Sequence, residues 1–99
     1  MNFEIAPKET EIQANWYDAK LYCFSLTIDG KSNWRLPTKV ELDEICKSKN
    51  DFETAWYWSA TEHNTEQAFA QYFGAGAGYK ASISKPVNID YVRAVRTIS

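Results

Sequence analysis

The chain changes its sequence pattern at Asn50, and this change constrains the fold more than any other feature. Before Asn50, two segments carry apolar residues at intervals of three and four, which is the spacing of an amphipathic helix. After Asn50, aromatic runs of strand length are separated by glycines and polar residues. A strand candidate at residues 3–6, ended by Pro7, precedes both helices. The order of one strand, two helices and then several strands predicts an α+β domain.

Local signals set the bounds of the first helix. Asn15 is suited to cap its start, and Asp18 lies in its first turn, where the helix dipole favours an acid. Asp29-Gly30 is predicted to end it. Its buried face is predicted to hold Trp16, Ala19, Cys23 and Leu26.

The second helix follows an extended segment. Pro37 keeps Leu36 out of the helical region, so residues 33–38 are predicted to be extended. Thr38-Lys39-Val40-Glu41 has the form of a capping box and starts the helix at Thr38. The helix is predicted to end over residues 47–50, with an apolar face formed by Leu42, Ile45 and Cys46.

The second half of the chain is predicted to be a set of strands. The glycines of residues 74–78 permit a tight hairpin turn between two of them. In the last strand, Val92 and Ala94 are predicted to face one side and Arg93 and Val95 the other. The predicted strands are residues 56–61, 68–73, 79–84 and 91–96.

The length and the apolar pattern predict one soluble domain spanning residues 1–99, with a core of its own. No apolar run approaches the roughly 20 residues of a spanning helix, so membrane insertion is not expected. The first residues lack the basic start and apolar run of a signal peptide. The sequence therefore predicts a protein that stays in the cytoplasm of its maker, or a domain cut from a longer chain.

The charge of the chain argues against a nucleic-acid partner. The net charge is −2 and the isoelectric point is about 5.3, whereas nucleic-acid binders present basic patches. The charge is unevenly spread, because residues 38–66 carry seven acids against three bases and residues 67–99 carry four bases against one acid. Two interpretations stay open: two differently charged faces of one domain, or an anion site near the C-terminal strands.

The cysteines and the single histidine give little support to catalysis. Cys23 and Cys46 lack CxxC spacing and lie in helical patterns, which favours buried, reduced thiols over a mutual disulfide or a reactive nucleophile. His63 lies in a polar run with no nucleophile motif to support a catalytic triad. Residues 74–78 lack the Gly-Lys-Ser/Thr ending of a P-loop. We expect neither an enzyme nor a bound cofactor.

Four motifs, in order and with matching spacing over residues 15–97, are similar to those of the C-terminal domain family of the Legionella collagen-like (Lcl) adhesin. They are Trp16-x-Asp18-Ala19 with Cys23, Trp34-Arg35-Leu36-Pro37-Thr38 with Glu41-Leu42, Tyr57-Trp58-Ser59-x-Thr61, and Tyr91-Val92-Arg93-x-Val95-Arg96. The second motif also resembles one in the formylglycine-generating (sulfatase-modifying) enzymes. The resemblance implies a C-type-lectin-like fold, with two helices flanking twisted antiparallel sheets.

The chain departs from its relatives at points that bear on function. Ala94 stands where family members often carry cysteine. If that cysteine normally bridges to the first helix, Cys23 here lacks its partner, and an extracellular adhesin role is not carried over. The chain has no late cysteine pair of the formylglycine-generating kind. It also lacks the Glu-Pro-Asn, Gln-Pro-Asp and Trp-Asn-Asp calcium motifs of C-type lectins, and Glu62, His63 and Glu66 are the remaining, weaker candidates for a metal site.

We therefore expect a non-enzymatic, C-type-lectin-like binding module that recognises a protein or glycan without calcium. Two alternatives are a small structural or assembly subunit, of a phage particle or of an intracellular homo-oligomer, and an intracellular module that sequesters a small anionic ligand. In such folds the ligand usually lies on the loop-rich face between late strands. The predicted ligand-binding residues on that face are Glu62, His63, Asn64, Tyr72, Tyr79 and Lys80.

Overall fold

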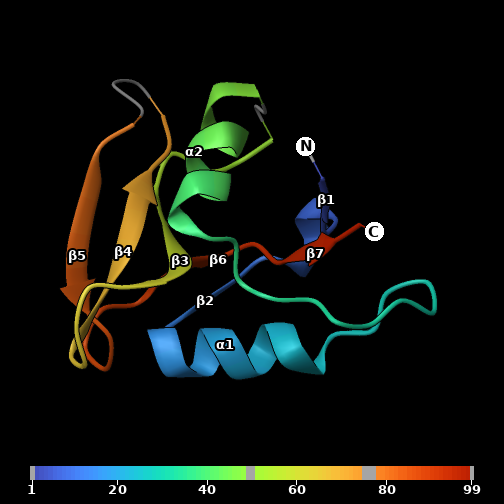
Figure 1. Cartoon of the computed structure of the whole chain (residues 1–99), viewed down its shortest axis with the longest axis horizontal. Helices are drawn as coiled ribbons and strands as arrows, with labels where there is room; N and C mark the ends of the chain where they lie inside the picture. The colour runs from blue at the N-terminus through green and yellow to red at the C-terminus, as the bar shows by residue number, and fades with distance from the viewer. Residues whose placement is uncertain (1, 49–50, 75–77, 99) are drawn as a thin grey trace.

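A five-stranded sheet, a two-stranded sheet and two helices make up the fold (Figure 1). The computed structural model describes residues 2–48, 51–74 and 78–98. The helices are α1 (Trp16–Ser25) and α2 (Lys39–Ser48), with a short 3-10 turn, η1 (Lys8–Thr10). In the two-stranded sheet β1 (Phe3–Ile5) pairs with β7 (Val95–Thr97). In spatial order, the larger sheet consists of β2 (Ile12–Ala14), β6 (Asp90–Val92), β3 (Trp56–Glu62), β4 (Gln67–Tyr72) and β5 (Lys80–Ser84).

This architecture confirms the predicted α+β class. Most strand pairs are antiparallel, as expected, but β3 and β6 pair in parallel through Tyr57 and Tyr91. The larger sheet is therefore mixed. The parallel pair arises because β6 follows a crossover from the β5 edge back to the other side of β3 (Figure 1).

Both helices begin where the sequence predicted. The Asn15 side chain accepts a hydrogen bond from Asp18 N at 2.9 Å, which caps α1. At the start of α2, Glu41 N donates to Thr38 Oγ1 at 3.1 Å and Thr38 N donates to Glu41 Oε1 at 2.8 Å. These two reciprocal bonds are a capping box.

The extended segment before α2 joins the two halves of the chain. Trp34 and Leu36 are buried, and Arg35 exchanges two backbone hydrogen bonds with Val95 at 2.8 Å. The Arg35 guanidinium also bonds both carboxylate oxygens of Glu41, at 2.7 and 2.9 Å. This bidentate ion pair fixes the segment against the first turn of α2.

The core is divided between the two faces of β3. Trp58 belongs to the cluster that buries the inner face of α1, and Tyr57 to the cluster that buries α2. Because neighbouring residues of a strand point to opposite faces, this pair directs the two clusters to opposite sides of the sheet. Trp58 Nε1 donates to Ala14 O at 2.9 Å and Trp16 Nε1 to Ser59 O at 2.9 Å, so both buried indoles are satisfied.

Three predicted boundaries were wrong. The helix α1 ends at Ser25, and Asp29-Gly30 instead forms a tight turn between Ile28 and Lys31, which exchange two backbone hydrogen bonds of 2.9 Å. Asp29 and Gly30 both have positive φ, of 51° and 76°, as a two-residue hairpin turn of this kind requires. The polar stretch before Asn15 contains β2, which the sequence pattern did not reveal because only Ala14 of the strand is buried.

The third wrong boundary concerns the last strand. Residues 91–96 form β6 and β7, which belong to different sheets, rather than one alternating strand. Val92, Arg93, Ala94 and Val95 are all buried, because the chain crosses the core between the sheets at this point. Residues 75–77 of the predicted glycine turn and residues 49–50 at the predicted end of α2 lie outside the described residues.

Both thiols are free. Cys23 is fully buried, as predicted, and burial raises its pKa to about 12. Cys46 is only half-buried, because it lies at the edge of the α2 cluster.

Candidate binding surface

The six predicted ligand-binding residues form two groups at opposite ends of the β3–β4–β5 ladder (Figure 1). Glu62 ends β3, and His63 and Asn64 follow it in the β3–β4 turn. Tyr72 ends β4, Lys80 begins β5, and Tyr79 directly precedes Lys80. The length of β4 separates the groups by about 17 Å at the usual rise of a strand. They do not make one surface.

The side chains of the first group interact with other residues of the fold. Glu62 accepts a 2.7 Å ion-paired bond from Lys85 Nζ, which lowers the pKa of Glu62. The side chain of Lys85 is only 2% exposed. The His63 ring lies edge-on to Phe69, with the ring centroids 5.4 Å apart. Asn64 Oδ1 accepts from two backbone N–H groups of the same turn and so shapes it.

The second group is partly free. Tyr79 is exposed, and its carbonyl accepts from Tyr72 N at 2.8 Å. Tyr72 packs on Trp56, with the ring centroids 5.7 Å apart. Lys80 Nζ lies 3.1 Å from Asp43 Oδ1 on α2. Lys47 and Lys80 together lower the pKa of Asp43 to about 2.

The cations of the C-terminal third are each paired with an acid from elsewhere in the chain. The uneven charge of the sequence is thus balanced within the fold, and it no longer favours an anion site. The pairs are Lys80 with Asp43, Lys85 with Glu62, Arg93 with Glu11 and Asp51, and Arg96 with Glu4.

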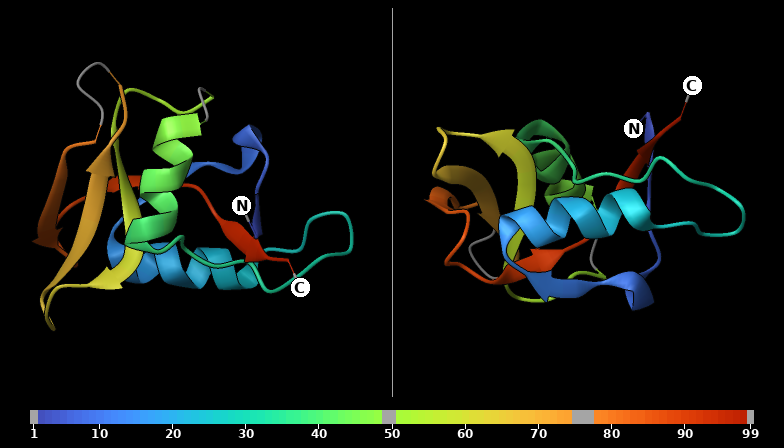
Figure 2. Two further views of the ribbon diagram at one scale, coloured as in Figure 1. Left: turned by 45° about the horizontal axis from the view of Figure 1, so that its top comes forward. Right: turned by 90° about the horizontal axis from the view of Figure 1, so that it is seen from below.

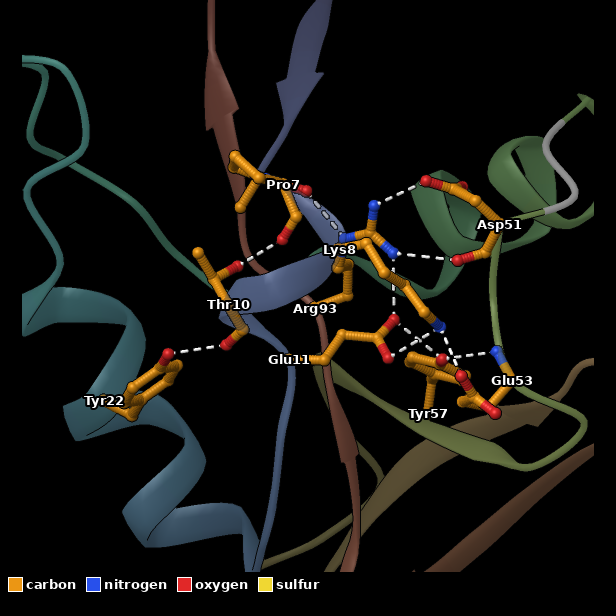
Figure 3. A network of polar contacts seen from close by, with 10 residues as sticks. Pro7, Lys8, Thr10, Glu11, Tyr22, Asp51, Glu53, Tyr57 and Arg93 are labelled. Carbon is orange, nitrogen blue, oxygen red and sulfur yellow. Dashed lines mark hydrogen bonds and ion pairs between the residues drawn. The ribbon is translucent and has the colours of Figure 1, made fainter.

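Arg93 is the centre of a buried polar network (Figure 3). Its Nε donates to Ala6 O at 2.6 Å, its Nη1 to Glu11 Oε2 at 2.9 Å and its Nη2 to Asp51 Oδ2 at 2.9 Å. Tyr57 OH donates to the same Glu11 oxygen at 2.8 Å, and burial raises the pKa of Tyr57. This network ties β1, β2, β3 and the segment after α2 to one side chain.

A hollow of about 460 Å³ lies beside this network, lined in part by Lys8, Glu9 and Asp51. Its charged groups are largely committed to each other, because Lys8 pairs with Glu11 and Glu53 and Arg93 pairs with Glu11 and Asp51. A charged ligand would have to break these pairs. We therefore interpret the hollow as part of this structural network and not as a ligand site.

Asp90 carries a poorly solvated carboxylate. Its Oδ2 is buried without a hydrogen-bond partner among the described residues, and burial raises its pKa from 3.8 to about 6. A carboxyl group with a raised folded-state pKa destabilises the fold when ionised, above pH 6. This cost disappears as the pH falls through 6 toward the unfolded-state value.

We expect Asp90→Asn to stabilise the protein at pH 7.5 and to lose this effect at pH 4. Because Asp90 keeps partial contact with water, the gain at pH 7.5 is about 1–2 kcal/mol rather than the full value of the shift. Urea melts of both proteins at the two pH values measure this difference in the free energy of unfolding. The other carboxylates are present in both proteins, so their contribution cancels in the difference. A gain that is equal at both pH values would show that the charge of Asp90 is not its cause.

The outer face of α1 is apolar and exposed. Leu21 and Phe24 are 68% and 81% exposed, and Tyr17 on the same face is half-exposed. These three residues lie at positions i, i+4 and i+7, which is one continuous stripe of a helix. The opposite stripe, with Trp16, Ala19 and Cys23, is buried in the core. Seen from below, α1 is the front layer of the molecule (Figure 2).

An apolar groove lies beside Leu21 and Phe24 of this stripe, and we call it the α1 groove. Its volume is about 390 Å³, within the range of ligand-binding pockets. Leu21 and Phe24 form the helical side, while Leu36 and Ala60 form the other side. Its full lining is Lys20, Leu21, Phe24, Trp34, Arg35, Leu36 and Ala60.

The charged residues at the groove are both cations, and they differ in their partners. Arg35 is neutralised by its bidentate pair with Glu41. Lys20 Nζ lies 4.7 Å from the centroid of the Trp16 ring, and no described carboxylate lies within ion-pair distance of it. Lys85 lies on the same ring, 4.5 Å from the centroid. The rim of the groove is therefore apolar with one cation, Lys20, that forms no ion pair with a described carboxylate, although its charge helps to lower the pKa of Glu62.

The residues of this stripe are not among the six predicted ligand-binding residues. A signal was present, because Tyr17, Leu21 and Phe24 make a second apolar stripe on a helix that already had one. A helix that is apolar on two sides is either fully buried or has an unpartnered face. The second stripe therefore indicates an apolar face that the fold leaves exposed.

The described residues hold neither a cluster of metal ligands nor a membrane-spanning helix. No three His, Cys, Asp or Glu side chains of residues 2–48, 51–74 and 78–98 come together as metal ligands. Over the same ranges, neither helix combines the length and the apolar character needed to cross a membrane.

The comparison with known proteins supports the family resemblance. The family model of the Lcl C-terminal domain matches residues 4–96, which is nearly the whole chain. No curated protein is significantly similar to the chain. The matched segment includes both helices, the extended segment 33–38 and every strand except the first residue of β1 and the last of β7. The chain belongs to the Lcl C-terminal domain family.

Proposed function

We propose that this protein is a non-enzymatic binding module with a C-type-lectin-like fold, and that it binds a segment of another protein in the α1 groove without calcium. The observation that carries the proposal is the exposure of Leu21 and Phe24 beside an apolar groove. Full burial of such a side chain is worth about 1.5–3 kcal/mol. Contiguous apolar patches on a protein surface usually mark interaction sites.

The composition of the α1 groove favours a protein segment over a glycan. Sugars are held by several polar side chains that hydrogen-bond their hydroxyls, in addition to aromatic stacking. In the α1 groove, Lys20 and Arg35 are the charged side chains, and Arg35 is already bonded to Glu41. Leu21, Leu36 and Ala60 offer no such bonds. An apolar side chain from a protein fits this lining better.

The positions of the histidine and of the buried cysteine favour binding over catalysis. His63, the only histidine, packs on Phe69 in a turn. Burial raises the pKa of Cys23 to about 12, which disfavours its thiolate. An assembly subunit is the second candidate, because the same apolar stripe could be covered by another copy of the chain.

The proposal is tested with a peptide library, a glycan array and two matched double variants. Leu21→Ser with Phe24→Ser removes the apolar face of the groove. Val87→Ser with Ile89→Ser removes two equally exposed apolar residues elsewhere and serves as the control. Surface changes of this kind are expected to alter stability by about 0.5 kcal/mol or less.

We expect the wild type to bind peptides, with and without a calcium chelator. The groove variant should lose at least about 1.5 kcal/mol of binding free energy, whereas the control variant should bind as the wild type does. Binding to glycans alone, or peptide binding that survives in the groove variant, would refute the proposal. Sedimentation provides the second arm, because a stable oligomer that dissociates only in the groove variant would establish the assembly subunit.

A further inference from the structure

Four backbone groups of residues that line the α1 groove are already hydrogen-bonded. Arg35 N donates to Val95 O at 2.8 Å, and Arg35 O accepts from Val95 N at the same distance. Ala60 N donates to Pro37 O at 2.7 Å, and Leu36 O accepts from Arg35 Nη1 at 3.2 Å. An extended peptide is held mainly by backbone groups of its receptor, and these four are taken. Its own N–H and C=O groups would lie unpaired against apolar side chains, which is costly.

A helix avoids this cost because it satisfies its backbone internally. The stripe on α1 also has the spacing that helix packing uses, with Tyr17, Leu21 and Phe24 at i, i+4 and i+7. The ten residues of α1 span about 15 Å, which matches about three turns of a second helix. The groove therefore fits the apolar face of an amphipathic helix.

The charge at the rim of the groove determines which charged residues the polar face of a bound helix should carry. Lys20 is exposed and has the Trp16 ring beside its ammonium group, while Arg35 is neutralised by Glu41. Both charged lining residues are cations, so an acidic side chain on the partner gains an attraction and a basic one is repelled.

We propose that the occupant of the α1 groove is an amphipathic helix of a partner protein, with apolar residues at i, i+4 and i+7 and an acidic residue placed beside Lys20. This inference rests on the proposed function and specifies the partner of the same groove. It specifies a helical conformation for the partner segment and a negative charge beside Lys20.

Three synthetic peptides of about 16 residues test it, a length at which an Ala-rich helix is appreciably populated. The first carries Leu at i, i+4 and i+7 with Glu beside the stripe. The second has Lys in place of each Glu. The third is the first peptide with a central proline, which breaks the helix. Fluorescence anisotropy measures dissociation constants to about 1 mM with the wild type, Lys20→Glu and Lys47→Glu.

We expect the acidic peptide to bind the wild type roughly 3- to 10-fold more tightly than the basic peptide, as expected for exposed charge pairs. Lys20→Glu should reverse this order. Lys47→Glu changes the net charge equally but lies on α2, outside the groove, and should leave the order unchanged. The proline peptide should bind at least 10-fold more weakly than its parent.

Each other outcome overturns the inference. Equal binding of the proline peptide would mean an extended occupant, and a charge preference that is unchanged in Lys20→Glu would mean that Lys20 does not select the partner. If neither helical peptide binds, the occupant is not an amphipathic helix. The proposed function is tested separately. It fails if peptides from the library still bind the variant with Leu21→Ser and Phe24→Ser.

Discussion

Replacement of Arg93 by methionine is expected to destabilise the protein by about 3–5 kcal/mol, the usual cost of removing one partner of a buried ion pair. The guanidinium bonds Ala6 O, Glu11 and Asp51, and its exposure is only 4%. Without it, the Glu11 carboxylate, itself 7% exposed, is left buried beside Tyr57 with Lys8 as its remaining cation. For a domain of this size such a loss is a large part of the total stability.

A double-variant cycle identifies the cause of this loss. Glu11→Gln removes the buried negative charge, so Arg93→Met should cost clearly less in that background than in the wild type. Arg93→Lys keeps the charge but cannot reach three acceptors with one ammonium group. Its free energy of unfolding should therefore lie between those of the wild type and Arg93→Met. Urea melts give the four free energies of unfolding. A loss below about 1 kcal/mol for Arg93→Met would contradict a central role of this network.

Trp58→Ala is expected to destabilise the protein by about 3–5 kcal/mol, as is typical of a buried tryptophan. Trp58 is fully buried in the α1 cluster, and its Nε1 donates to Ala14 O at 2.9 Å. The substitution leaves a cavity between α1 and the sheet and an unpaired carbonyl on β2. It removes the residue that joins α1, β2 and β3.

The matched control is Trp56→Ala, two residues earlier on the same strand. Trp56 is half-buried and packs on Tyr72 near the end of the hairpin, so its loss should cost clearly less than that of Trp58. Thermal or urea melts of the two variants provide the comparison. Equal losses would show that the burial of Trp58 in the α1 cluster has no special weight.

The sequence predicted those parts of the fold that depend on short-range signals. The capping residues Asn15 and Thr38, the extended Leu36-Pro37 and most of the helix faces act over a few residues, and the structure confirms them. Leu26 is an exception, because it follows the end of α1 and is only partly buried. The aromatic strands after Asn50 were found for the same reason. Such signals are set by backbone geometry and side-chain alternation, which need no knowledge of distant contacts.

The errors arose where long-range contacts decide the structure. The break between β6 and β7 is stabilised by Arg93, which reaches Glu11 and Ala6 more than eighty residues away in the chain. The strand β2 exists because it pairs with β6, and its own residues are mostly polar. Asp29-Gly30 has the residues of a helix stop and also those of a hairpin turn, and only the pairing of Ile28 with Lys31 decides between them.

The six ligand-binding residues expected from the sequence stay a prediction. Polar loop residues such as Glu62 and Asn64 were chosen because loops often carry binding sites, but their side chains bond within the fold. Exposure is a property of the packed chain, so the sequence could not distinguish the buried stripe of α1 from the exposed one. The structure does so through Leu21 and Phe24.

The most direct measurement of the central claim is an NMR titration of the uniformly labelled protein with the acidic helical peptide, followed through the backbone amide shifts. If the α1 groove is the binding surface, the shifts will concentrate in residues 17–24, at Arg35 and Leu36, and at Ala60. Residues 62–64 and Tyr79 will then stay unchanged. Shifts confined to the β3–β4 turn or to the start of β5, with α1 unaffected, would contradict the account.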